Sequence, residues 1–132
     1  MANSFSLENF GKALGKLGEF VREPVKNERD MAGIIQAFEY TFELAWKALQ
    51  AHARQEGLEL ASPKRALQYA MSAGFILVEQ EEHWLRMLED RNLTSHVYHE
   101  KTAMQVSDRI MKSHLPHLSS LHRSLSGANA KD

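Results

Sequence analysis

Apolar residues recur every three or four positions along most of this chain, which is the pattern of amphipathic helices. In the longest such stretch, Ile35, Phe38, Phe42, Ala45 and Leu49 form one continuous stripe. Similar stripes precede and follow it, so nearly the whole sequence predicts helix. The predicted helices cover residues 6–22, 27–57 and 62–74, a stretch from about residue 79, and residues 101–121.

Local signals mark where several of these helices begin and end. Asn27 or Asp30 is suited to cap the start of the second helix. Ser62 followed by Pro63 is typical of a helix start, because proline is favoured at the first helical position. Gly57 stands where a left-handed residue closes a helix. The second and third predicted helices are therefore joined by a short connection.

Glycine and proline residues indicate where the other helices are weakened, end or bend. Gly11, Gly15 and Gly18 lie nearly one turn apart, so they either weaken the first helix or let another helix approach it closely. Gly74 closes the third helix, and the strand-like run at 75–78 lacks a partner strand, so we expect a buried connector. Pro116 should kink the fifth helix or end its regular part.

These elements predict an all-α fold, an antiparallel up-and-down bundle of four to five helices. We expect one domain over residues 1–125 and a flexible C-terminal tail at 126–132. In the fifth helix, apolar residues repeat every seven positions, at Met104, Met111, Leu118 and Leu125, with Val106, Ile110, Leu115 and Leu121 beside them.

Composition narrows the possible functions. The 132 residues are 43% hydrophobic and 25% charged, which is typical of a globular protein. Cysteine does not occur, so disulfides and thiolate metal sites are excluded. The net charge of −1 argues against binding nucleic acid by bulk electrostatics, although residues 79–90 are acidic and 101–123 basic. Without a secretory signal or an apolar run long enough for a membrane span, we expect a cytoplasmic protein.

The stretch DRNLTSHVYHE at 90–100 concentrates polar side chains between two helical segments. Trp84, Leu88, Arg91, Ser95 and Tyr98 are spaced as one inward seam, so an arginine stands where a core residue is expected. A buried arginine is costly unless it is paired or meets an anion. The stretch is therefore either an ordinary helix surface with its connector or a site with chemistry.

Two further residues of this stretch extend the candidate site. Asn92 continues the neighbouring edge of the seam. His96 follows Arg91 by five residues, about 140° around a straight helix, so the two meet only if the helix loosens or a second subunit brings them together. The histidine pairs at 96/99 and 114/117 lack a nearby third ligand, so no metal or other cofactor is expected.

The same string carries a resemblance to a known family. RNLTSH fits the R-x4-H signature of the HEPN superfamily, and RNLTSHVY fits the longer form found in HepT-like toxins. The blocks FEYTFELAWKAL (38–49), SPKRALQYAMSAGFI (62–76) and HWLRMLEDRNLTSHVYHE (83–100) resemble the subfamily described as nucleotidyltransferase substrate-binding proteins. The similarity covers residues from about 5 to 125.

The resemblance implies a helical homodimer whose partner is a minimal nucleotidyltransferase encoded beside it. Many HEPN proteins are metal-independent endoribonuclease toxins. Carried over, Arg91 would contact the scissile phosphate of RNA and His96 would move protons, with Asn92 and Ser95 as supporting binding residues. Tyr98 would be the residue that the partner adenylylates as antitoxin.

Two other functions fit the same residues. In the main alternative, the protein is the non-catalytic substrate-binding subunit of a two-component nucleotidyltransferase, and these side chains bind a nucleotide or a protein. The near-neutral charge favours this alternative. A purely structural dimerising bundle would leave the inward arginine unexplained.

Overall fold

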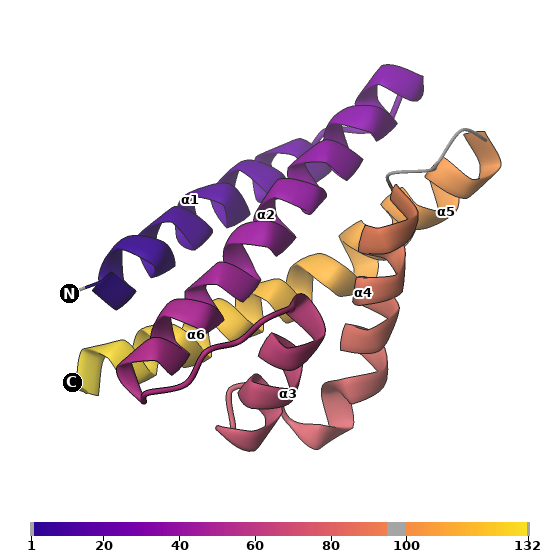
Figure 1. Cartoon of the computed structure of the whole chain (residues 1–132). Helices are drawn as coiled ribbons and strands as arrows, with labels where there is room; N and C mark the ends of the chain where they lie inside the picture. Colours follow the sequence, from indigo (N-terminus) through magenta and orange to yellow (C-terminus); the bar gives the residue numbers. More distant parts are fainter. Residues whose placement is uncertain (1, 95–99, 132) are drawn as a thin grey trace.

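The regular structure of the protein is helical throughout the part that a computed structural model describes, residues 2–94 and 100–131. The prediction of an all-α antiparallel bundle is confirmed. In Figure 1, α1 and α2 form a long antiparallel pair, and α6 returns beside them. The elements are α1 (Ala2–Arg22), α2 (Glu28–Gln55), α3 (Pro63–Ser72), the 3₁₀ turn η1 (Val78–Gln80), α4 (Glu81–Thr94), α5 (Glu100–Arg109), the π-helical turn η2 (Ile110–His114) and α6 (Leu115–Lys131).

The predicted caps of α2 and α3 are confirmed, whereas α1 begins at Ala2, four residues before the predicted start at residue 6. Asn27, rather than Asp30, caps α2, and its side-chain oxygen accepts a hydrogen bond from the Asp30 amide at 2.9 Å. Ser62 caps α3 in the same way through the Arg65 amide. Gly57 has the positive φ of 79° that closes α2 at little steric cost.

Two predicted segments differ from the structure. Helix α6 continues to Lys131, so residues 126–131, assigned from the sequence to a flexible tail, are helical. The connector after α3 is buried only at Ile76, whereas Leu77 and Val78 are exposed where η1 begins. The apolar run therefore anchors the connection through Ile76 and through the partly buried Phe75, whose ring packs edge-on against His52 at 4.9 Å.

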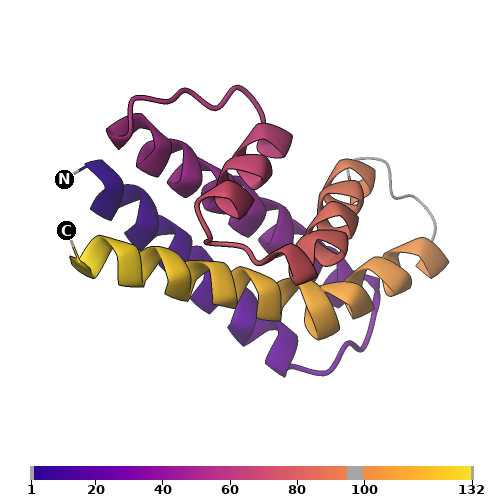
Figure 2. The same cartoon turned by 90° about the horizontal axis from the view of Figure 1, so that it is seen from below.

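The core fills the space between α1, α2 and the C-terminal helices. It includes fully buried side chains from α1, α2, α4, η2 and α6, among them Phe10, Leu17, Phe38, Phe42, Leu49, Met87, Ile110, Leu118 and Leu121. Thr41, also buried, donates a hydrogen bond from α2 to the Ala13 carbonyl oxygen of α1 at 3.2 Å. Figure 2 shows the same long helices from below.

The predicted fifth helix is divided by the π-helical turn η2. The Leu115 amide donates to the Ile110 carbonyl oxygen, five residues back, instead of four. Pro116, in the first turn of α6, has no amide hydrogen, and its ring crowds the carbonyl four residues earlier. The π-helical turn lies just before Pro116. The predicted break in the regular helix is therefore present, but it begins at residue 110.

This turn shifts the face that the chain buries. Leu118 and Leu125 lie in the core as predicted, but Met104 is exposed and Met111 is half-buried. The seven-residue repeat therefore follows the buried face only in α6. In α5 and at the start of η2 the buried residues are Ser107 and two of the neighbouring predicted residues, Val106 and Ile110. The extra residue of a π turn rotates the preceding helix relative to the following one, which accounts for the change of face.

Candidate functional site

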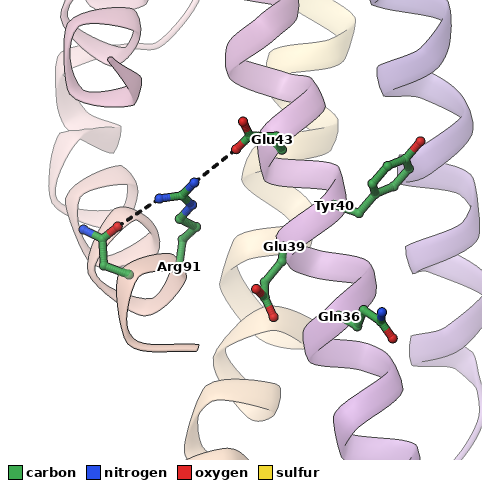
Figure 3. A pocket seen from close by; sticks show the side chains of 6 residues that line it. Gln36, Glu39, Tyr40, Glu43 and Arg91 are labelled. Carbon is green, nitrogen blue, oxygen red and sulfur yellow. Dashed lines mark hydrogen bonds and ion pairs between the residues drawn. The ribbon is translucent and has the colours of Figure 1, made fainter. Parts of the chain in front are cut away.

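Arg91 lies in the last turn of α4 and extends toward α2. Its Nη2 atom donates to Glu43 Oε2 at 3.1 Å, and its Nη1 atom donates to Asn92 Oδ1 at 3.2 Å (Figure 3). The Arg91 and Glu43 side chains are 36% and 34% exposed. An ion pair this exposed contributes only about 0–1 kcal/mol to stability. The pair therefore orients the guanidinium more than it stabilises the fold.

An open groove lies beside this pair, between α2 and α4. The four α2 residues that line it are spaced so that they share one helix face. The groove has a volume of about 510 Å³. Its lining residues are Gln36, Glu39, Tyr40 and Glu43 from α2, and Arg91 and Asn92 from α4. Such a space accommodates part of a small ligand or an extended segment of a partner.

The charge of the groove is mixed. Glu39 and Glu43 carry two carboxylates, and Arg91 carries the cation among the lining residues. Arg91 already donates to Glu43, so a phosphate would share the guanidinium with that carboxylate or displace it. This differs from the uniformly basic clefts that bind a nucleic-acid backbone by charge. The groove favours a ligand that offers both an anion and hydrogen-bond donors.

Of the residues predicted for the site, Arg91 and Asn92 meet at the groove. Ser95, His96 and Tyr98 lie outside the described residues. Arg91 is half-buried and paired with Glu43, which offsets the cost of removing its charge from water. It lies at the rim of the groove and not in the core. Within residues 2–94 and 100–131, no three histidine or carboxylate side chains gather as metal ligands.

The buried charge of α4 is Asp90, a residue that the sequence interpretation missed. Asp90 is 1% exposed and follows Trp84 and Met87 at intervals of three, so the inward face of α4 passes through it. That spacing was the available signal. Asp90 accepts hydrogen bonds from Arg109, through Nε and Nη2, both at 2.8 Å, and from His114 Nε2 at 2.7 Å.

The electrostatics of Asp90 follow from these contacts. Burial alone raises the pKa of Asp90, but the hydrogen bonds from Arg109 and His114 and the charges of both groups outweigh it and lower the pKa to about 2. The hydrogen bond to Asp90 in turn raises the pKa of Arg109. At neutral pH, Asp90 is therefore a carboxylate held by two residues of the C-terminal half.

Comparison with known proteins places this geometry in a family. The model of the family described as nucleotidyltransferase substrate binding protein-like matches residues 5–127. A crystal structure of a protein from Thermus thermophilus superposes with a TM-score of 0.75 at 38% identity, over 90% of this chain and 97% of that chain. No curated protein matches the chain. In the described residues, no helix is long and apolar enough to cross a membrane. With nearly its whole length matched, the chain belongs to the nucleotidyltransferase substrate binding protein-like family.

Proposed function

We propose that this protein is the partner subunit of a nucleotidyltransferase and that the groove beside Arg91 holds a nucleotide-bearing substrate. One observation carries the proposal: the Arg91 guanidinium is held by Glu43 at the rim of an open groove. A nucleotide offers a phosphate for Arg91 and hydroxyl or amino donors for Glu39 and Glu43. The family of the chain supports the same partner.

The first experiment tests the partner. The protein is co-expressed with the minimal nucleotidyltransferase that we expect to be encoded beside it, and the complex is isolated by gel filtration with light scattering. We expect the two chains to elute together. Separate elution of both purified chains at micromolar concentration would contradict the proposed partner.

The second experiment tests the groove. AMP and ATP are titrated calorimetrically into the wild type, Arg91→Ala and Arg54→Ala. Arg54 forms an exposed ion pair with Glu59 at 3.0 Å and does not line the groove, so it controls for the loss of one surface cation. We expect Arg91→Ala to weaken binding about tenfold or more, since charge-assisted bonds to phosphate are strong. Equal effects of both variants would refute a site at Arg91.

A second candidate function is a metal-independent endoribonuclease, and the position of Arg91 favours it. Its guanidinium stands at an open groove, and His96 follows five residues later in the string RNLTSHVY. RNA supplies its own 2′-hydroxyl nucleophile, while histidine transfers protons near neutral pH and arginine stabilises the charged transition state. A homodimer would bring a second histidine across its two-fold axis. Adenylylation of Tyr98 by the partner would silence this activity.

Two variants separate the candidates. His96→Ala should abolish RNA cleavage and growth toxicity while leaving the circular dichroism spectrum unchanged; full activity of this variant excludes the endoribonuclease. Tyr98→Phe should remove the adenylate mass that co-expression with the partner adds to the wild type. Wild-type protein without that added mass would exclude Tyr98 as the modified residue.

A further inference from the structure

Asp90 joins three elements in a buried cluster of charged groups. Its two carboxylate oxygens each accept a hydrogen bond from the guanidinium of Arg109 at the end of α5. One of these oxygens also accepts a hydrogen bond from His114 of η2. Asp90 and His114 are each 1% exposed. Arg86, one turn earlier on α4, approaches the outer edge of the carboxylate at 3.9 Å. We refer to Asp90, Arg109 and His114 as the Asp90 clasp.

The π-helical turn makes the clasp possible. Arg109 and His114 are five residues apart, which on a regular α-helix places them about 140° from each other. In η2 the hydrogen bond from the Leu115 amide spans five residues instead of four, so a residue and the fifth one after it return to the same face. Both side chains therefore reach one carboxylate. Single π turns inside helices are frequent at functional sites.

His114 is held firmly in this position. Its ring stacks on Phe38 of α2, with centroids 5.3 Å apart and an interplanar angle of 26°. Its Nδ1 atom is buried and has no hydrogen-bond partner among the described residues. Because a carboxylate only accepts, Nε2 is the atom that donates to Asp90. The cluster thus links α4 and η2 to the central helix of the bundle.

The clasp stands directly beside the candidate site. Asp90 precedes Arg91, and successive residues of a helix point about 100° apart. When Asp90 is fixed toward Arg109 and His114, the rotation of α4 about its axis is fixed, and Arg91 is directed toward Glu43 of α2. The clasp also joins α4, which ends at Thr94, to α5, which begins at Glu100 (Figure 1).

We propose that Asp90, Arg109 and His114 are positioning residues, which set the direction of Arg91 in the groove and hold α4 and α5 together. The clasp does not touch the ligand. A purely structural role would change only the stability of the fold. A positioning role changes the surroundings of Arg91 in protein that is still folded.

The direct test observes Arg91 itself. The Nε–Hε signal of Arg91 is recorded by ¹H–¹⁵N NMR and assigned by its loss in Arg91→Lys. Arg109→Lys keeps the charge but loses the two-point fork on Asp90. We expect it to shift or broaden the Arg91 signal at a temperature where circular dichroism shows folded protein. Folded Arg109→Lys with an unchanged Arg91 signal would overturn the proposal.

A matched control and a milder variant complete this test. Tyr69→Phe removes a hydrogen bond of 2.7 Å between α3 and His52 of α2, far from Arg91 in the chain, and should leave the Arg91 signal unchanged. His114→Phe keeps a ring beside Phe38 and removes one hydrogen bond to Asp90. If Arg109→Lys does not fold, His114→Phe decides the question by the same criterion.

A second readout rests on the part of the proposed function in which the partner adenylylates Tyr98. The rate at which the purified nucleotidyltransferase transfers adenylate to this protein is measured at increasing concentrations of this protein. We expect Arg109→Lys to lower the transfer rate about tenfold or more, since small misplacements of binding groups are costly, while Tyr69→Phe stays near wild type. A wild-type rate of adenylate transfer to Arg109→Lys contradicts the proposed positioning role of the Asp90 clasp. A wild type without transfer contradicts the proposed adenylylation of Tyr98 alone, because the NMR signal still reports on Arg91.

Discussion

Two adjacent residues of α4 have opposite environments. Asp90 is buried and accepts three hydrogen bonds, whereas Arg91 is about a third exposed and pairs with the half-buried carboxylate of Glu43. The helical turn of about 100° between neighbours accounts for the difference. One residue fixes the helix to the bundle, and the next presents a cation to the groove.

The lowered pKa of Asp90 makes part of the stability depend on pH. The folded-state pKa is about 2, below the usual value of 3.8, so the contribution is complete above pH 4 and is lost as pH falls toward 2. The difference corresponds to about 2 kcal/mol. In urea unfolding followed by circular dichroism at pH 7, 4 and 2.5, Asp90→Asn should be destabilised at pH 7 by about 3 kcal/mol and lose less stability on acidification than the wild type.

An exposed carboxylate provides the control for this titration. Glu59 pairs with Arg54 at the surface, so Glu59→Gln should change stability by less than about 1 kcal/mol and keep the wild-type dependence on pH. A wild-type profile for Asp90→Asn would show that Asp90 is not the group responsible.

Glu43 limits the access of anions to Arg91. Glu43→Gln removes the charge that shares the guanidinium, so inorganic pyrophosphate should bind about fivefold more tightly, corresponding to about 1 kcal/mol. Calorimetric titration measures this change. Glu39→Gln removes a charge from the same groove, but Glu43 is the carboxylate that accepts from Arg91 at 3.1 Å, so the effect of Glu39→Gln should be smaller. Equal gains would mean that only the net charge of the groove matters.

At the scale of elements, one glycine of α1 permits the approach of α6. A Cβ atom at Gly11 would lie 2.8 Å from His122 Nε2, whereas one at Gly15 would meet nothing within 4 Å. The His122 ring packs edge-on against Phe10 at 5.2 Å and would have to move. The expected close approach of a helix thus applies to Gly11 and not to Gly15.

These two positions form a matched pair for mutation. Gly15→Ala should stabilise the protein by up to about 1 kcal/mol, because alanine favours the helix. Gly11→Ala gains the same propensity but displaces His122, so it should be less stable than Gly15→Ala by about 1–2 kcal/mol in thermal unfolding. Equal stabilisation by both would show that α1 and α6 adjust without cost.

Sequence reasoning succeeded where the signals are local. Asn27, Ser62 and Gly57 act within one turn of their own positions, so capping and turn chemistry predicted them. It failed where residues far apart in the chain decide the outcome. Asp90 is stable in the core only because Arg109 and His114 arrive from another element, and their alignment depends on a π turn without a clear periodic signal. The sequence therefore drew attention to Arg91 but not to its buried neighbour Asp90.

For the whole molecule, the start of α1 and the end of α6 lie near each other at one end of the bundle. The C-terminal end of α4 and the start of α5 lie toward the other end (Figures 1 and 2). The last turn of α4, which carries Arg91, therefore lies toward the end of the bundle opposite the start of α1 and the end of α6.

The last prediction concerns assembly of two chains. Tyr40 lines the Arg91 groove with 64% of its surface exposed, and large exposed aromatic side chains are enriched in protein interfaces. We expect a homodimer, with a mass twice the 15.0 kDa of one chain in light scattering at micromolar concentration. Tyr40→Glu should shift the mass toward the monomer, whereas Val78→Glu, on the equally exposed η1, should not. A monomeric wild type would refute the dimer, and it would also weaken the endoribonuclease candidate, which needs a second histidine from the partner chain.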